Sequence, residues 1–343
     1  MSVKILNENL KSKNFSTLYY IFGEEEYLKN FYFSQLKSNV VQDLPEFNIT
    51  EFDSKTYNFL DFSNSVNSYP MMAEKKLVTV VDFDNSVLKG NASKELSSFL
   101  KTIPEFCVVA FFDSQAKTIT PSNPLQKLIA SAGGVCVEVK KPDMRSLSSW
   151  VNRHFKSYNK TISTEDMNYL IDIADCDMMS LDNEINKLCT YVTGEIVTKG
   201  DIDKIVTRSI ETNRYEIADA FCNKNYSKIF EIVDLLYKQC VEDIVIANLF
   251  YRAFSDIWKA KLSSTSRKSA SDLSKDFKLN PYAVNRILKN ADKLPLSVLE
   301  RIVHLSLRLD IDLKSTPFDK KGLLLTYVAS IIDIRENYGK INN

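Results

Sequence analysis

The 343-residue chain has 44% apolar and 26% charged residues, the composition of an ordinary globular protein with two or three domains. Its 44 Lys and Arg residues equal its 44 Asp and Glu residues, which excludes a large overall positive charge as the means of binding nucleic acid or membranes. No apolar run approaches the ~18 residues of a membrane-spanning helix, and the initial sequence MSVKILNENLKSKN lacks an apolar signal segment, so we expect a cytoplasmic protein without a membrane partner.

Five short runs rich in apolar, β-branched and aromatic residues predict strands in the first part of the chain. They are LYYIF (18–22), FNITEF (47–52), LVTVV (77–81), CVVAFF (107–112) and VCVEV (135–139). Helix-compatible stretches separate them, and CVVAFF does not alternate apolar and polar residues, which is typical of a strand buried on both faces of a parallel sheet. The pattern predicts a doubly wound α/β domain with a five-stranded parallel sheet at residues 1–141.

Helical periodicity replaces this pattern after the sequence KKPDMRSLSSW. Apolar residues recur at helical spacing over 147–155 and 178–192. Between these stretches, Ser163 is followed three residues later by Asp166, as at the capped start of a helix. These signals predict a small helical domain at residues 142–210.

The remaining residues, 211–343, are almost entirely helical in their periodicity. Asn280 and Pro281 suit the cap and the first position of a helix, whereas the Ser-rich segment SSTSRKSASD (263–272) predicts a loop. The region is close to the usual size of a domain. We therefore expect a third, all-helical domain.

A phosphate-binding loop is suggested by the position of LYYIFGEEEYLKN (18–30) but not by its chemistry. An apolar strand ends at Gly23 and a helix follows, yet Glu24, Glu25 and Glu26 stand where a nucleotide-binding protein places glycines, a lysine and Ser or Thr. The glutamates would interact favourably with the positive end of the helix dipole and would repel a polyphosphate. We therefore favour a structural role for this turn.

Asp82 is the second residue with a possible catalytic role. It follows the apolar run LVTVV, as the magnesium-binding Asp does in a P-loop ATPase. The next residue is Phe83, where such enzymes often carry a catalytic Glu, and the chain contains no GKT sequence. A turn residue is therefore the favoured interpretation of Asp82.

Metal and cofactor sites are not indicated by the sequence. The six cysteines stand far apart without a CxxC pair, whereas zinc sites usually contain closely spaced pairs, so we interpret them as reduced thiols. His154 and His304 lie among apolar residues and are interpreted as packing residues. We expect no catalytic residue, no cofactor and no metal.

Matching stretches throughout the chain indicate a family. They are YYIFGEEEYL, PMMAEKKLVTV, MMSLDNEINKLCTYV, IVTKGDIDKIV and the long C-terminal stretch that begins with LNPYAVNRILKNA. Together with the order of the three domains, they resemble the delta subunit family of the bacterial DNA polymerase III clamp loader, an inactive branch of the AAA+ class. The resemblance covers nearly the whole chain.

The resemblance implies a non-catalytic subunit that binds the ring-shaped sliding clamp (the beta subunit) and opens or holds open one ring interface. It also implies ATPase and delta-prime subunits as partners, a collar formed by the C-terminal domain, and primer–template DNA as a partner only within the complex. Clamp contact in the family comes from an apolar pair before the third strand. The corresponding residues here are Met71 and Met72, with Tyr69 as a further contributor.

Apart from the resemblance, two methionines after Pro70 would more often be core residues. The flanking sequences SYP and AEKK are polar or turn-forming, however, which favours an exposed tip. Methionine suits such a tip because its flexible side chain fills irregular pockets.

Two other functions remain open. The segment SDLSKDFKLNPYAVNRILKNA (271–291) is similar to a helix-turn-helix, and Arg286, Lys289 and Lys293 share one face, which would suit a DNA-binding regulator. The alternatives are a solvated basic face or a patch that faces DNA inside the loader. An active AAA+ ATPase or a delta-prime-like subunit is disfavoured, because the chain lacks GKT and the cysteines of a zinc module.

Overall fold

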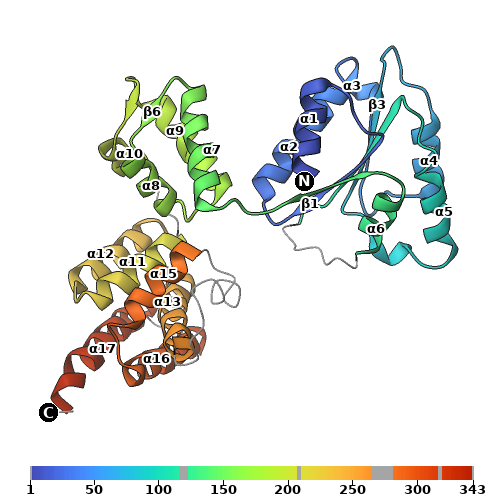
Figure 1. Ribbon diagram of the computed structural model, residues 1–343. Coiled ribbons are helices and arrows are strands. Elements are labelled where there is room, and N and C mark those ends of the chain that lie inside the picture. Colours follow the sequence, from blue (N-terminus) through green and yellow to red (C-terminus); the bar gives the residue numbers. More distant parts are fainter. Residues whose placement is uncertain (1, 116–122, 207–209, 265–280, 316–318, 342–343) are drawn as a thin grey trace. The chain divides into compact units, whose positions relative to one another are not determined.

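The chain folds into two compact units (Figure 1). The computed structural model describes residues 2–115, 123–206, 210–264, 281–315 and 319–341. The first unit contains Met1–Asn159 with Met178–Ile185, and the second contains Lys160–Asp177 with Asn186–Asn343. The expected second domain, 142–210, falls partly in each unit, so the division into three domains stays a prediction.

A five-stranded, all-parallel sheet forms the centre of the first unit. The strands are β1 (Leu18–Gly23), β2 (Ile49–Phe52), β3 (Lys76–Val81), β4 (Cys107–Phe112) and β5 (Val135–Val139). Their order in the sheet is β2-β3-β4-β1-β5. Each strand lies on one of the five predicted runs, so the predicted α/β sheet is confirmed.

Helices cover both faces of this sheet, as a doubly wound fold requires (Figure 1). One face carries α1 (Ser2–Ser12) and α2 (Glu26–Val40), and the other carries α4 (Phe59–Asn67), α5 (Asn91–Phe99) and α6 (Pro124–Ser131). Along β1, Ile21 belongs to the apolar cluster under α1 and α2, whereas Phe22 belongs to the cluster under α4, α5 and α6. Successive strand residues therefore pack against the helices on opposite faces of the sheet. Helix α1 is a feature that the sequence analysis did not predict.

Further elements of the chain up to residue 206 are divided between the two units. They are α3 (Pro45–Asn48), the 3-10 turn η1 (Asn85–Val87), α7 (Met144–Ser157), β6 (Thr161–Ile162), α8 (Thr164–Ile173), α9 (Met178–Tyr191), β7 (Ile196–Val197) and α10 (Lys199–Ile205). The predicted cap of α8 is confirmed, because Ser163 Oγ accepts a hydrogen bond from the backbone N–H of Asp166 at 3.0 Å.

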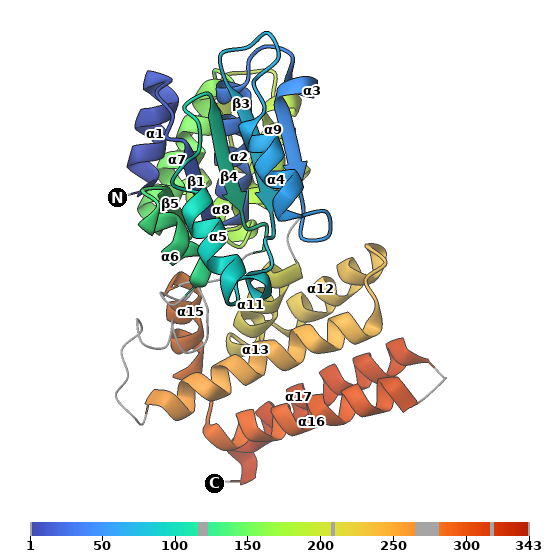
Figure 2. The same cartoon turned by 90° about the vertical axis from the view of Figure 1, so that its right-hand side faces the viewer.

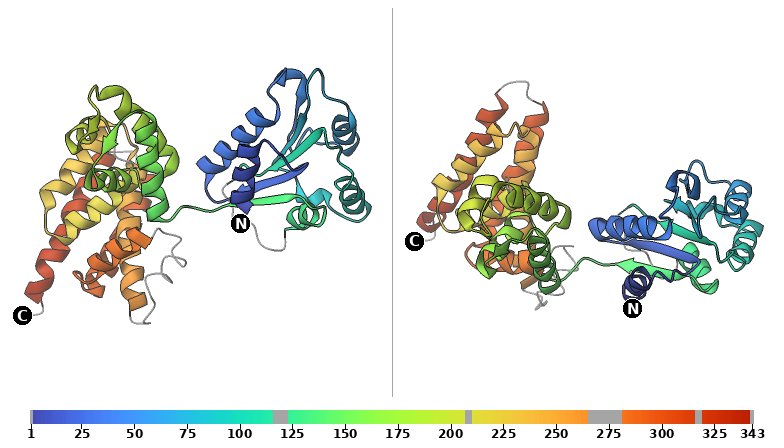
Figure 3. Two further views of the ribbon diagram at one scale, coloured as in Figure 1. Left: turned by 45° about the horizontal axis from the view of Figure 1, so that its top comes forward. Right: turned by 90° about the horizontal axis from the view of Figure 1, so that it is seen from above.

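Long helices build the C-terminal part of the second unit (Figure 2, Figure 3). They are α11 (Ile210–Cys222), α12 (Tyr226–Lys238), α13 (Asp243–Ser264), α15 (Pro281–Ala291), α16 (Leu296–Ser315) and α17 (Lys320–Ile341). Helix α13 supplies the buried Phe250, Phe254 and Ile257 to one continuous apolar core shared by these helices. The predicted helical character is confirmed, while the predicted loop 263–272 lies almost wholly outside the described residues. Among the helices that the structure describes, none is both long and apolar enough to cross a membrane.

A glycine in the turn from β1 to α2 and a buried lysine in α2 both contact neighbouring backbone. Gly23 has φ +134°, and a Cβ at this position would lie 2.1 Å from the carbonyl oxygen of Val139, so the position requires glycine. In the first turn of α2, Lys29 is fully buried, and its Nζ donates to the backbone carbonyls of residues 113–115 at 2.7–3.3 Å. Burial lowers the pKa of Lys29, although nearby carboxylates favour its charged form. The three carbonyls replace part of the hydration that the ammonium group has lost.

Replacement of Lys29 by methionine should destabilise the protein, because three backbone carbonyls would lose their common donor. Hydrogen bonds to a charged group contribute about 1.5–3 kcal/mol each to stability, so we expect the free energy of unfolding in urea to fall by at least about 2 kcal/mol. Lys37→Met on the same helix is the matched control. Lys37 forms an ion pair with Glu51 at the surface, and such pairs contribute about 0–1 kcal/mol. Equal stability of the two variants would contradict this account of Lys29.

Candidate partner-binding site

The loop between α4 and β3, residues 68–75, carries the three residues predicted to contact a partner and is here named the tip loop. Because β2, β3 and β4 run parallel, the loop lies at the amino-terminal edge of the sheet. Its side chains Tyr69, Met71 and Met72 are 82%, 49% and 84% exposed. The methionines are therefore surface residues, as their polar flanks predict, and are not part of the core.

Asn48, the last residue of α3, holds the tip loop from one side. Its side chain is fully buried. Oδ1 accepts a hydrogen bond from the backbone N–H of Met71 at 2.7 Å, and Nδ2 donates to the carbonyl of the same residue at 2.9 Å. Nδ2 also faces the carbonyls of Asp43 at 3.1 Å and Leu44 at 3.2 Å. One amide group therefore joins the segment before β2 to the backbone of Met71.

Contacts with the segment before β4 hold the tip loop from the other side. The ring of Tyr69 stacks on Phe106 with a centroid separation of 4.7 Å. Lys75 donates from Nζ to the carbonyl of Glu105 at 3.0 Å. Lys76, whose pKa is lowered by burial, donates from Nζ to Ser68 Oγ at 2.6 Å. The loop is thus fastened to the segments that precede β2 and β4, and the bond from Lys76 joins its first residue to the start of β3.

Met72 has an unusual backbone conformation. Its φ is +49°, in the left-handed region, which costs a residue with a Cβ roughly 1–2 kcal/mol. Such a conformation persists where surrounding contacts determine it. Here the bonds from Asn48 hold the backbone of the preceding residue, and the side chain of Met72 is 84% exposed.

The sequence analysis missed Asn48 and its neighbour Phe47, whose side chain is 59% exposed. Both belong to the predicted strand 47–52, but β2 begins at Ile49, and the two residues end α3. Local periodicity carries no signal for the role of Asn48, because its partner Met71 is 23 residues away in the sequence.

The carboxyl-terminal edge of the sheet is occupied by hydrogen bonds within the protein. Glu25 caps α2, because its Oε1 accepts from the backbone N–H of Tyr27 at 3.2 Å. Asp82 accepts from the backbone N–H of Ser114 at 2.8 Å and from its hydroxyl at 2.6 Å. These contacts agree with the structural interpretation of the glutamates and with Asp82 as a turn residue.

Two of the cysteines, Cys107 and Cys222, are buried in the protein, and His154 lies beside a carboxylate. Burial raises the pKa of Cys107 and of Cys222 to about 12, which keeps both thiols protonated near neutral pH. His154 Nε2 lies 3.4 Å from Oδ1 of Asp182. Within the described part of the chain, no group of three or more His, Cys, Asp or Glu side chains is arranged to hold a metal ion.

The predicted basic patch consists of three residues with different surroundings. Arg286 on α15 is only partly exposed, and its Nε lies 2.6 Å from Asp219 Oδ2 while a second nitrogen lies 3.5 Å from Asp172. Lys289 is exposed. Lys293 lies beyond the end of α15, and its Nζ donates to Asn223 Oδ1 at 2.6 Å. The first helix of the predicted helix-turn-helix, before residue 281, lies outside the described residues.

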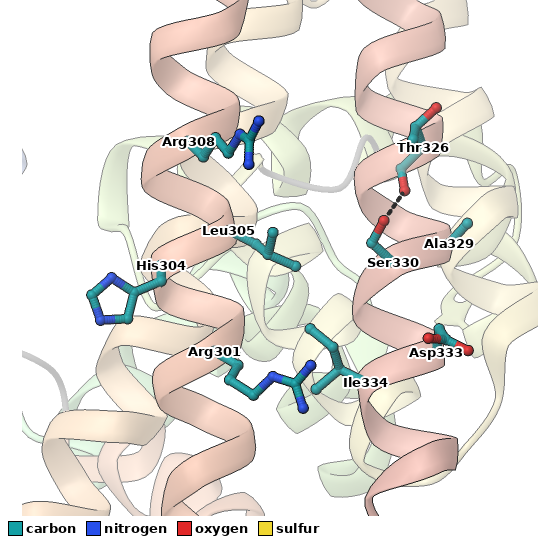
Figure 4. Close-up of a pocket in the computed structure, with 9 residues that line it drawn as sticks. All are labelled: Arg301, His304, Leu305, Arg308, Thr326, Ala329, Ser330, Asp333 and Ile334. Atoms are coloured by element: carbon teal, nitrogen blue, oxygen red, sulfur yellow. Dashed lines mark hydrogen bonds between the residues drawn. The ribbon is translucent and has the colours of Figure 1, made fainter.

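An open groove of about 760 Å³ lies between α16 and α17 (Figure 4). Arg301, His304 and Arg308 line it from α16, and Asp333 and Ile334 line it from α17. His304 is exposed, so its interpretation as a packing residue was wrong. The preceding residue, Val303, is buried in the core, while His304 itself faces outward.

Family models match both ends of the chain. The model described as DNA polymerase III, delta subunit, matches residues 19–132, and the model described as DNA polymerase III delta subunit, C-terminal domain, matches residues 211–331. The first match covers β1 to β4, from Tyr19 onward, and the tip loop, but not β5. The second spans the long helices from α11 to most of α17.

Relatives match over most of the chain as well. The chain is 24% identical over 339 residues to DNA polymerase III subunit delta of Bacillus subtilis (strain 168), a match that covers 96% of each. It is 23% identical over 227 residues to a probable DNA polymerase III subunit delta of Aquifex aeolicus (strain VF5), covering 64% of this chain and 63% of the relative.

A solved structure shows the same fold. The Bacillus subtilis DNA clamp loader delta protein aligns with a TM-score of 0.72 at 23% identity, covering 97% of this chain and 100% of that one. The predicted fold class, a parallel α/β domain followed by helical regions, is thereby confirmed. Taken with the two family models and the relatives, this agreement shows that the chain belongs to the DNA polymerase III delta subunit family.

Proposed function

We propose that this chain binds the sliding clamp through its tip loop and holds one interface of the clamp ring open. Met71 and Met72 would enter an apolar pocket of the clamp, with Tyr69 beside them. The observation that carries the proposal is the exposure of two adjacent methionines on a loop fastened from both sides. Family membership supports the choice of partner, since the Bacillus subtilis relative is a clamp loader protein.

The size of the tip is adequate for such an interaction. Burial of a methionine side chain contributes about 1.5–3 kcal/mol, less up to about 2 kcal/mol for the entropy of fixing its rotamers. A few residues commonly supply most of the affinity of an interface. Two methionines on a loop that is already ordered would therefore contribute up to a few kcal/mol to clamp binding, as part of a larger interface.

Ring opening would follow from differential binding. If the tip loop fits a deformed clamp better than a closed one, binding shifts the ring toward the open form without any reaction in this chain. We therefore propose a non-catalytic subunit, with ATP hydrolysis left to partner subunits. The glutamates at 24–26 and the occupied carboxyl edge of the sheet support this assignment.

We also propose three functional regions and their partners. Residues 1–141 would bind the clamp, 142–210 would form a small helical domain, and 211–343 would form a collar with the ATPase and delta-prime subunits of the loader. Bacterial DNA replication is a cytoplasmic process, so the cytoplasm is the proposed location.

Primer–template DNA is proposed as a partner only within the assembled loader. Lys289 and Lys293 are exposed and can reach phosphates. Arg286 lies beside two carboxylates, which reduces the positive charge that it presents. This pairing disfavours a helix-turn-helix regulator that reads DNA by itself, because a specific base contact by Arg286 would require breaking two ion pairs.

The double change Met71→Ala with Met72→Ala should weaken binding of the cognate sliding clamp at least tenfold, because it removes both anchors. Surface plasmon resonance with immobilised clamp measures this affinity. Met179→Ala is the matched control, since Met179 is also an exposed methionine but lies on α9. Normal clamp binding by the double variant, or a large loss of thermal stability, would contradict the assignment of the tip.

The isolated protein should bind no ATP, because acidic side chains replace the lysine and glycines of a phosphate loop. Titration calorimetry with ATP and magnesium should give no saturable heat up to millimolar nucleotide. In the reconstituted loader, Asp82→Asn should leave ATP hydrolysis and clamp loading nearly unchanged. A micromolar dissociation constant for ATP, or failure of a folded Asp82→Asn variant to support loading, would overturn the non-catalytic assignment.

Labelled primer–template DNA should bind the reconstituted loader but not the isolated chain at moderate salt. Lys289→Ala with Lys293→Ala should lower the affinity of the loader for this DNA several-fold. The slope of the logarithm of the binding constant against the logarithm of the salt concentration should become less steep, by about 0.9 for each phosphate that is no longer neutralised. Lys314→Ala is the control, because Lys314 pairs with Asp310. Tight, sequence-dependent binding by the isolated chain would favour a DNA-binding regulator instead.

A further inference from the structure

We infer that Asn48 is a positioning residue that holds Met71 and Met72 ready for the clamp before the clamp arrives. The inference rests on the proposed function of the tip loop as the clamp-binding element. It concerns a residue that does not itself reach the surface, since Asn48 is fully buried while both methionines are exposed. Asn48 would therefore act through the backbone of Met71.

The side chain of Asn48 bonds to two parts of the protein, the segment before β2 and the backbone of Met71. The carbonyls of Asp43 and Leu44, at 3.1 and 3.2 Å, hold its amide nitrogen against the segment before β2. The same carboxamide then offers one acceptor and one donor to Met71, at 2.7 and 2.9 Å. This is the pairing that a neighbouring strand would offer to a backbone residue, here supplied by one side chain.

The residue type is determined by this pairing. A carboxamide can accept from an N–H and donate to a C=O at the same time. An aspartate would accept from Met71 but could not donate to the carbonyls of Met71, Asp43 and Leu44. An alanine would do neither, and a glutamine would place the amide one methylene too far. A threonine hydroxyl also accepts and donates, but it has one oxygen and one hydrogen, so it could not serve Met71 and the carbonyls before β2 together.

The bonds from Asn48 affect which conformations the tip loop adopts. Met72 has a left-handed backbone, which a free loop would seldom adopt. Without the bonds from Asn48, the tip loop should sample other conformations, and only a fraction of molecules would present both methionines correctly. The apparent dissociation constant for the clamp rises by the inverse of that fraction. A competent fraction of one tenth corresponds to tenfold weaker binding.

A double-mutant cycle tests the inference with the full-length protein and purified cognate clamp. Asn48→Ala and Asn48→Asp are each made with the native tip and with Met71→Ala and Met72→Ala. Asn58→Ala is the matched control: Asn58 caps α4 in the same unit by accepting from the backbone N–H of Leu60, but it does not bond to the tip loop. Binding is measured by surface plasmon resonance at a temperature where circular dichroism shows every variant folded.

We expect both Asn48 variants to bind the clamp about tenfold more weakly than the native protein, and Asn58→Ala to bind within twofold. In the background without the methionines, the Asn48 changes should add less than threefold, because there is no anchor left to position. If loss of the methionines weakens binding but the Asn48 variants bind with native affinity, the inference is overturned while the proposed function stands. An equal effect in both backgrounds would also overturn the inference. Unchanged binding after loss of the methionines would overturn the proposed function and the inference with it.

A measurement on the unmodified protein covers the case in which the Asn48 variants do not fold. Hydrogen–deuterium exchange of the Met71 amide in the free protein should be at least a hundredfold slower than in an unstructured peptide, because its N–H is bonded to a buried acceptor. Exchange at the rate of an unstructured peptide would show a loop that is not held, and would overturn the inference.

Discussion

Burial of the central strands on both faces is the constraint on which the first unit depends. Every residue of β1 and β4 is buried, and helices lie on both sides of the sheet, so these central strands have no free face for a ligand. The turns where the strands begin and end are the parts of the sheet that carry the residues discussed above.

The carboxyl and amino edges of the sheet differ in the side chains that they carry. At the carboxyl edge, where ligands commonly bind in open α/β sheets, Lys29 and Asp82 are engaged with the protein's own backbone and side chains. At the amino edge, Asn48 and Phe106 support a loop whose apolar side chains face solvent. Lys29 and Asp82 are thus satisfied within the protein, whereas the tip loop exposes Met71 and Met72 to solvent.

Features encoded by local sequence could be predicted, and features formed by distant residues could not. The runs that became β1 to β5 and the cap at Ser163 depend on neighbours a few positions away, and the polar flanks of the methionines indicated their exposure. Asn48 was assigned to a strand because FNITEF resembles one, and nothing nearby identifies Met71 as its partner. Lys29 likewise bonds to carbonyls 84 to 86 residues away, and the carboxylates beside Arg286 come from other helices.

The left-handed backbone of Met72 limits which residues can replace it. Glycine and asparagine adopt this conformation readily, but neither provides a long apolar side chain. Valine and isoleucine provide apolar surface, but branching at Cβ makes a positive φ especially unfavourable for them. Under the proposed clamp contact, position 72 combines a backbone that favours small residues with a need for a large apolar side chain. Long side chains without a branch at Cβ, such as methionine and leucine, are the narrow class of natural residues that can serve there.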